Sequence, residues 1–143
     1  MTNAAALAPM VALVFVTFAV WTMLFIRRIP KLKSDPVPLD AMRIRATRPI
    51  LSEQEMAAND NLMNLFELPV LFYALCLALA VTGWRSDFFS FGCWGYVGLR
   101  AVHSAIHCTF NNVLMRFVAY LLSTLLLFAL WVGFALRLAA LGR

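Results

Sequence analysis

Three polar side chains recur at helical spacing inside an apolar stretch of this sequence. Asp60, Asn64 and Glu67 are separated by four and three residues, so a helix would present them on one face. Charged groups inside an apolar helix are costly and usually face a partner or a wet cavity. Carboxylate and amide groups can bind the ammonium and amide groups of a ligand. The pattern therefore indicates a polar binding face.

A second polar face follows, made by Arg100, His103, His107 and Asn111. These residues also recur at helical spacing, and Arg116 follows after a short Asn-containing turn that lets it reach the same level. A guanidinium presents a planar fork of donors that binds carboxylates and can hold a thiolate. We predict that the two faces meet at one end of the molecule and bind an anionic, polar ligand.

Two other interpretations of these residues remain open. Glu67 and Arg100 could form a buried ion pair, with the Asn and His side chains serving as hydrogen bonds between helices. His103 and His107 stand four residues apart and could ligate a metal or relay protons. No Glu lies between the histidines, and the neighbouring arginines would repel a cation, so the sequence predicts no metal site.

The chain that must position these groups is more apolar than a soluble domain of its size. Of its 143 residues, 63% are hydrophobic, and a membrane-spanning helix needs about 20 mainly apolar residues. We predict one all-α domain over residues 1–143, an integral membrane bundle of four transmembrane helices at about 4–26, 53–82, 88–110 and 115–141. A cleaved signal peptide is the alternative for the first helix, but basic residues follow its apolar run instead of preceding it.

The basic residues predict the orientation of the bundle. Seven of the twelve Lys and Arg residues lie between residues 27 and 52, and cytoplasmic loops carry an excess of such residues. We therefore predict that loop 27–52 and the turn between the third and fourth helices are cytoplasmic, with both termini on the opposite side. Because most of the basic residues indicate how the chain is oriented in the membrane, the net charge of +5 does not indicate that it binds nucleic acid. The prolines of the loop predict an extended path; they are Pro30, Pro36, Pro38 and Pro49.

Local signals predict where the second helix begins, bends and ends. Ser52 and Glu55 have the spacing of a capping box, in which each side chain accepts from the backbone N–H of the other. Pro69 predicts a kink, because proline removes a backbone hydrogen bond. Gly83 predicts the end of this helix.

Small residues and cysteines indicate tight packing of the bundle. Glycines in the third helix would let a neighbouring helix approach closely; they are Gly92, Gly95 and Gly98. The three cysteines lie inside predicted spans without metal-type spacing, so we predict buried apolar side chains and no disulfide framework. They are Cys76, Cys93 and Cys108.

Two motifs on the second and third predicted helices resemble those of a known family. Residues 64–69, Asn-Leu-Phe-Glu-Leu-Pro, are similar to the family's Asn-x-x-Glu followed shortly by Pro. The other motif is Arg100-x-x-His103-x-x-x-His107, followed by Arg116. The family is that of the membrane-associated proteins in eicosanoid and glutathione metabolism (MAPEG), and the chain resembles a bacterial-type member over nearly its whole length.

The resemblance implies a homotrimer that binds glutathione as a co-substrate between neighbouring subunits, near the cytoplasmic face. By this resemblance, Asn64 and Glu67 hold the γ-glutamyl end of glutathione, and Arg116 stabilises its thiolate. Arg28, or its neighbour Arg27, resembles a family arginine that binds a glutathione carboxylate. The remaining pocket residues would be Arg100, His103, His107 and Asn111.

The implied activity is that of a glutathione transferase or peroxidase acting on hydrophobic electrophiles or lipid hydroperoxides. The protein would be a multi-pass membrane protein, in the inner membrane if bacterial, with lipid, the thiol, a hydrophobic substrate and further copies of itself as partners. The chain departs from the family at His107, where well-studied members carry Tyr, and at Asp60, where some carry Arg. Its Glu-to-Pro spacing is also shorter than in some members. These departures keep a non-catalytic scaffold or lipid-binding protein as the alternative.

Overall fold

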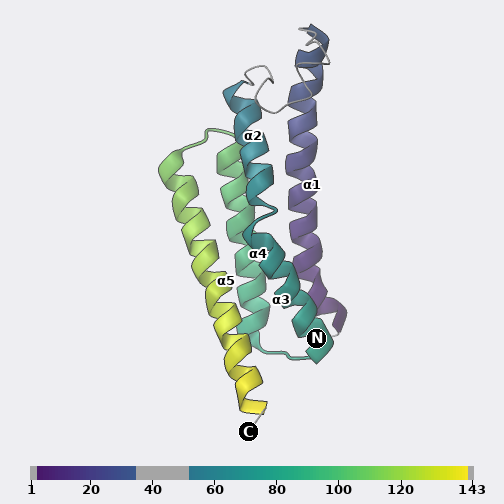
Figure 1. Ribbon diagram of the computed structural model, residues 1–143, viewed down its shortest axis with the longest axis vertical. Helices are drawn as coiled ribbons and strands as arrows, with labels where there is room; N and C mark the ends of the chain where they lie inside the picture. The colour runs from purple at the N-terminus through teal and green to yellow at the C-terminus, as the bar shows by residue number, and fades with distance from the viewer. Residues whose placement is uncertain (1–2, 35–51, 142–143) are drawn as a thin grey trace.

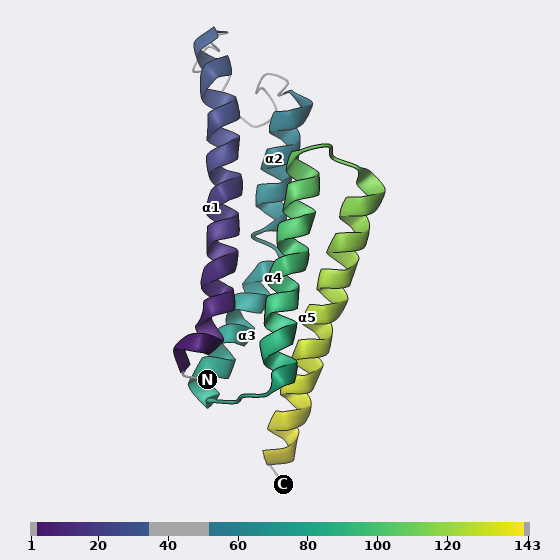
Figure 2. The same cartoon turned by 180° about the vertical axis from the view of Figure 1, so that it is seen from behind.

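The computed structural model describes residues 3–34 and 52–141, and every helix or strand assigned in these ranges is an α-helix. In chain order the helices are α1 (Asn3–Ser34), α2 (Glu53–Asn64), α3 (Leu68–Thr82), α4 (Asp87–Cys108) and α5 (Val113–Leu141). Because α2 and α3 follow one another along one bent path, the five helices form four rods packed side by side (Figures 1 and 2). The predicted all-α bundle is confirmed.

Three of these rods are long and apolar enough to cross a membrane. They are residues 6–30 of α1, residues 53–82 of α2 and α3 together, and α5. The helix α4 has 22 residues, about enough to cross the hydrocarbon at about 1.5 Å per residue, but its polar residues lower its hydropathy. Three of the four predicted spans are thus supported, and a fourth crossing along α4 stays a prediction.

The first helix is longer than predicted. The sequence predicted that α1 ends near residue 26 and that a loop begins at residue 27, whereas α1 continues through Pro30 to Ser34. Arg27 ties this end of α1 to its neighbours, because its guanidinium donates to the Gln54 carbonyl at 3.1 Å and to the Cys108 carbonyl at 2.6 Å. A proline removes one backbone hydrogen bond and crowds one carbonyl, and a helix that is held in this way can continue past it. Residues 35–51, the rest of the predicted loop, lie outside the described residues.

The capping box predicted at the start of α2 is present. Ser52 Oγ accepts from the Glu55 backbone N–H at 3.4 Å, and the Glu55 carboxylate accepts from the Ser52 backbone N–H at 3.0 Å. The same carboxylate also accepts from the Ser52 hydroxyl at 2.7 Å. These bonds satisfy backbone donors that the first turn of a helix leaves without partners.

The kink predicted at Pro69 is a complete break. The helix α2 ends at Asn64, and α3 begins at Leu68 with Pro69 in its first turn. Between them, Glu67 has φ −89° and ψ −104°, outside the helical region. Pro69 has no N–H to donate, and its ring crowds the carbonyl four residues earlier, so the helical hydrogen-bond ladder stops here. The break separates residues that one continuous helix would have aligned.

Glycines bring α4 against α5. A Cβ at Gly92 would lie 2.5 Å from Leu130 Cδ2, and a Cβ at Gly95 would lie 3.3 Å from Leu126 Cδ2. The close packing predicted for these two glycines is therefore observed. Gly98 is different, because a Cβ there would meet no described residue within 4 Å.

Candidate functional site

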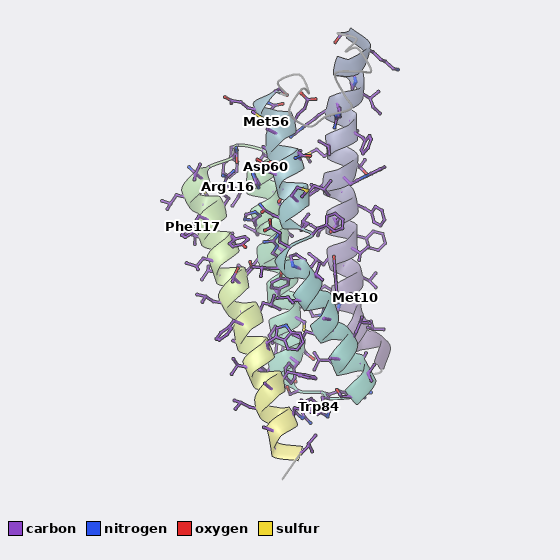
Figure 3. All side chains as sticks on the ribbon, viewed as in Figure 1. Met10, Met56, Asp60, Trp84, Arg116 and Phe117 are labelled. Carbon is purple, nitrogen blue, oxygen red and sulfur yellow. The ribbon has the colours of Figure 1, made fainter. Side chains whose placement is uncertain are left out.

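A hollow of about 340 Å³ lies where α2, α4 and α5 meet, near the α4–α5 turn. Figure 3 places Asp60 of α2 and Arg116 of α5 together at this end of the bundle. The wall consists of polar residues from all three helices and apolar residues from α5: Asp60, Asn64, His103, His107, Val113, Arg116, Phe117 and Tyr120. The hollow therefore unites four of the predicted site residues, Asn64, His103, His107 and Arg116.

The Arg116 guanidinium is held in place by two side chains. Its Nη1 donates to His107 Nε2 at 2.8 Å and to Asn111 Oδ1 at 2.7 Å. Both bonds use Nη1, so neither of them occupies the N–H groups of Nη2 and Nε, which can donate to a ligand. Asn111 adopts a left-handed φ of 47°, which asparagine tolerates better than most residues. Asn111 is thus placed beside the hollow as the support of Arg116.

Both histidines have the tautomer that carries its proton on Nδ1. His107 Nε2 accepts from Arg116, so the proton of a neutral His107 ring is on Nδ1. His103 Nδ1 donates to the Arg116 carbonyl at 2.8 Å, so His103 Nε2 carries a lone pair. Both rings are 3% exposed, and His107 Nδ1 and His103 Nε2 have no hydrogen-bond partner among the described residues. The hollow thus has one unused donor and one unused acceptor in its wall.

Arg100 lies behind the wall of the hollow instead of in it. Its side chain is fully buried, and its Nη2 donates to the Asn64 carbonyl at 2.8 Å. In a continuous helix that carbonyl would accept from the N–H of residue 68, so the break at Pro69 leaves it available. The guanidinium also lies 5.5 Å from the ring centroid of Tyr120. Arg100 therefore caps the C-terminal end of α2 and packs against Tyr120, which lines the hollow.

Glu67 is not part of the hollow. It was predicted to share one face with Asp60 and Asn64, but its side chain is exposed and does not line the cavity. The helical periodicity that aligned the three residues ends at the break after Asn64, which explains the difference. The carboxylate instead stands at the N-terminal end of α3, where the helix dipole favours negative charge.

The basic residues at the end of α1 also lie away from the hollow. Arg28 is half-buried on α1, which contributes no residue to the wall. Arg27, its alternative, holds α1 against α2 and α4 through the backbone carbonyls described above. This bonding gives Arg27 a structural role within the subunit.

The sequence interpretation missed the contribution of α5 beyond Arg116. Phe117 and Tyr120 line the hollow, and neither was among the predicted site residues. The signal was present, because Tyr120 stands four residues after Arg116 and therefore on the same helical face. Tyr120 also contacts His103, with ring centroids 5.8 Å apart.

A comparison with protein families shows the family of this chain. A model described as the MAPEG family matches residues 6–136, which include every residue of the hollow. The chain belongs to the MAPEG family. Together with the apolar helices, this membership makes it a membrane protein. The MAPEG family includes glutathione transferases and peroxidases. No curated protein and no solved structure matches the chain.

Proposed function

We propose that this MAPEG protein binds glutathione or a related low-molecular-weight thiol in the hollow. It then transfers the thiol to hydrophobic electrophiles or uses it to reduce lipid hydroperoxides. The observation that carries the proposal is the convergence of Asn64, His103, His107 and Arg116 on one cavity. The family supports the choice of thiol, since MAPEG members use glutathione.

Arg116 is the residue that stabilises the thiolate. A guanidinium beside the sulfur favours the charged form and so lowers the pKa of the bound thiol. His107 and Asn111 hold Nη1 in a fixed position, which means that little reorganisation is needed when the charge forms.

His103 is the base that accepts the thiol proton. Its Nε2 has a lone pair, is buried and has no partner among the described residues. The bond from Nδ1 to the Arg116 carbonyl fixes the ring orientation and links the base to the helix that carries the thiolate-stabilising arginine. His107 Nδ1, which donates, serves a carbonyl or carboxylate of the ligand.

The second substrate enters along the apolar part of the wall. Val113, Phe117 and Tyr120 lie on the same helix as Arg116 and line the same hollow. A hydrophobic electrophile or hydroperoxide packed against these side chains would lie beside the activated sulfur. The cysteine that reacts belongs to the ligand.

The assembly is a homotrimer of four-span subunits with the hollow on the cytoplasmic side. Glu67 supports an assembly, because an exposed carboxylate flanked by the exposed Phe66 and Val70 is costly in lipid. A neighbouring subunit would cover this carboxylate and let it contribute to a thiol site shared between subunits. Arg28, at the end of α1, and the segment that joins α1 to α2 would lie on the same, cytoplasmic, side.

The test is the unfolding midpoint (Tm) of the detergent-purified chain against increasing glutathione. A ligand that binds only the folded state raises Tm in a saturable way. We expect such a rise, and we expect Glu67→Gln to weaken it, whereas Arg116→Ala should keep most of it. Glu53→Gln is the matched control, because Glu53 is exposed in the first turn of α2 and lies outside the hollow.

The alternative function is that of a non-catalytic scaffold or lipid-binding protein. Asp60 favours it, because a carboxylate in the wall of the hollow repels the carboxylates of glutathione. A Tm that does not respond to glutathione, in the wild type as in Arg116→Ala, would overturn thiol binding and leave this alternative. A rise for wild type that Asp60→Asn enhances would show that the thiol binds despite this repulsion.

A further inference from the structure

The hollow carries two opposite charges that do not pair with each other. Asp60 enters its wall from α2 and Arg116 from α5, and Figure 3 places both side chains at this end of the bundle. Arg116 donates to His107 and Asn111 through Nη1. Within the described part of the chain, no hydrogen bond or ion pair involves the Asp60 carboxylate. The hollow thus presents a carboxylate without a partner and the remaining N–H groups of a guanidinium to the same space.

The Asp60 carboxylate does not help to build its own helix. The other acids of α2, Glu53 and Glu55, lie in the first turn, where the helix dipole favours negative charge, and Glu55 completes the capping box. Asp60 lies in the second half of α2, where the dipole gives no such stabilisation. Aspartate is also a poorer helix former than glutamate. The helix gains nothing from this carboxylate, which is therefore free to serve a ligand.

The residue after Asp60 fixes how α2 lies against α4. Asn61 is fully buried, its Nδ2 donates to Cys108 Sγ at 3.4 Å, and its Oδ1 accepts from the Ser104 hydroxyl at 3.2 Å. Each of these two partners directly follows a histidine of the hollow in the chain. The bonds hold α2 on α4 at the level of the hollow, so Asp60 keeps its place in the wall.

A ligand that fits this wall carries charges of both signs at separate positions. Its anion lies against Arg116 and its cation against Asp60. The cation is an ammonium group and not a metal ion, because metal ions need several ligands and Asp60 is the one carboxylate among the described wall residues. Asp60 repels the carboxylates of a thiol that is bound the other way round, so the two charges also fix the orientation of the ligand.

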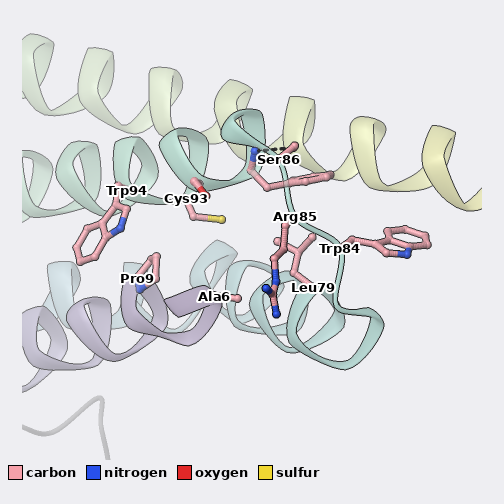
Figure 4. Close-up of a pocket in the computed structure, with 10 residues that line it drawn as sticks. Ala6, Pro9, Leu79, Trp84, Arg85, Ser86, Cys93 and Trp94 are labelled. Carbon is pink, nitrogen blue, oxygen red and sulfur yellow. Dashed lines mark hydrogen bonds between the residues drawn. The ribbon is translucent and has the colours of Figure 1, made fainter. Parts of the chain in front are cut away.

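The cavity at the opposite end of the bundle lacks this pair of charges. It measures about 30 Å³, and its wall includes Arg85 with apolar side chains such as Pro9, Leu79 and Trp94 (Figure 4). The described residues that line it include no carboxylate. A space of this size holds about one or two molecules as small as water. Of these two spaces, the hollow is the one that combines room for a small thiol with both charges.

We propose that Asp60 binds the ammonium group of the thiol, so that the hollow selects zwitterionic thiols over thiols of the same size that carry only carboxylates. This inference rests on the proposed function and names the class of thiol. In glutathione the group is the α-ammonium of the γ-glutamyl residue, with the thiolate at Arg116. The family resemblance assigns this end of glutathione to Asn64 and Glu67, but Glu67 does not line the hollow and Asp60 does.

The experiment compares two thiols that differ in one group. They are glutathione and its des-amino analogue, in which a hydrogen replaces the α-ammonium, and the Kd of each is taken from the Tm rise of the full-length, detergent-purified chain. We expect the wild type to bind the analogue about 10-fold or more weakly, as expected for the loss of a hydrogen bond from a charged group. In Asp60→Asn the two affinities should lie within about threefold of each other, because asparagine keeps the shape and loses the charge.

Matched variants separate Asp60 from the other acids. Glu53→Gln should keep the wild-type ratio of the two affinities, because Glu53 is exposed in the first turn of α2 and outside the hollow. Glu67→Gln should keep the ratio too, whatever it costs in affinity for both thiols. Asp60→Glu retains the charge and should retain the preference for glutathione, which a change that only damaged the fold would not do.

The outcomes distinguish this inference from the proposed function. Equal wild-type affinities for the two thiols, or the same ratio in Asp60→Asn as in the wild type, would overturn the role of Asp60 while thiol binding stands. A larger Tm rise with glutathione in Asp60→Asn than in the wild type would overturn it as well, because Asp60 would then face a carboxylate of the ligand. Loss of the ratio in Glu67→Gln alone would assign the ammonium to Glu67. A flat response to both thiols would overturn the proposed function, and this inference with it.

Discussion

The two ends of this bundle are built from the same rods but leave different spaces between them. At one end, α2, α4 and α5 enclose a hollow of about 340 Å³ whose wall carries a guanidinium, two imidazoles, a carboxylate and an amide. At the other end, the packing of α1, α3 and α4 leaves about 30 Å³ beside aromatic rings and a thiol. The first space can hold a polar ligand and the second only a very small molecule.

The difference arises from what interrupts the helices at each level. Near the hollow, the break at residues 65–67 leaves the Asn64 carbonyl without a helical donor. The buried Arg100 guanidinium donates to this carbonyl instead. Further along α4, Gly92 and Gly95 let α5 pack against the backbone, and Phe72 stacks on Tyr96. A proline and a few glycines thus decide which end is open and which is closed.

The largest expected effect comes from removing the guanidinium at the open end. Arg116→Ala should lower the rate of glutathione conjugation by about 100-fold or more, as loss of a preorganised donor to a developing anion does. The thiolate ultraviolet absorption that appears on adding glutathione should fall with it, while most of the affinity for glutathione remains. The control is Arg137→Ala, which removes an arginine that contacts Trp84 at the other end of the same helix. Equal losses of activity in both variants would contradict the role of Arg116.

The next effect concerns the base. His103→Asn keeps an N–H near the position of Nδ1 that can donate to the Arg116 carbonyl, but has no basic nitrogen. We expect kcat for conjugation to fall by about 100-fold, the low end of what general-base catalysis contributes. Affinity for glutathione, measured by its effect on Tm, should change little. If the affinity for glutathione fell as much as kcat, His103 would have a structural role and not that of a base.

Packing at the closed part of the bundle should be sensitive to single methyl groups. Gly92→Ala would place a Cβ 2.5 Å from the Leu130 side chain, and such overpacking costs about 1–3 kcal/mol of stability. Gly98→Ala is the matched control, because its Cβ would meet nothing within 4 Å in the described part of the chain and alanine favours a helix by about 0.5–1 kcal/mol over glycine. Thermal unfolding in detergent should therefore show opposite signs for the two variants. The same sign for both would mean that the α4–α5 approach is looser than described.

The smallest effect is expected at the helix cap. Ser52→Ala removes the side chain that accepts from the Glu55 N–H, which costs about 1 kcal/mol at an N-terminus. Hydrogen exchange at the backbone of residues 53–56 should accelerate, because the first turn of α2 frays. Glutathione affinity should stay unchanged, since Ser52 is outside the hollow. Gln54→Ala, in the same turn but outside the capping box, should leave the exchange rates as they are.

Several features of the protein follow from the sequence alone because their causes are local. The apolar runs predict membrane helices, since burial in lipid depends only on the length and composition of a segment. Ser52 with Glu55 predicts the cap, and Pro69 predicts an interruption, because both act within one turn of the backbone. The motifs around Asn64, Glu67 and His103 predict the family that the comparison shows.

Other features were decided by tertiary structure, because they depend on contacts between distant segments. The extension of α1 to Ser34 is accompanied by bonds from Arg27 to Gln54 and Cys108. The burial of Arg100 behind the hollow depends on a carbonyl that only the broken helix makes available.

The same reason explains what periodicity missed at the site. Spacing predicts which residues share a face only while a helix continues, so Glu67 left the face of Asp60 and Asn64 once the chain broke. Tyr120 entered the wall because α5 packs against α4 at the level of His103. The types of side chain available to the site were fixed by sequence, and their grouping was fixed by how the helices break and pack.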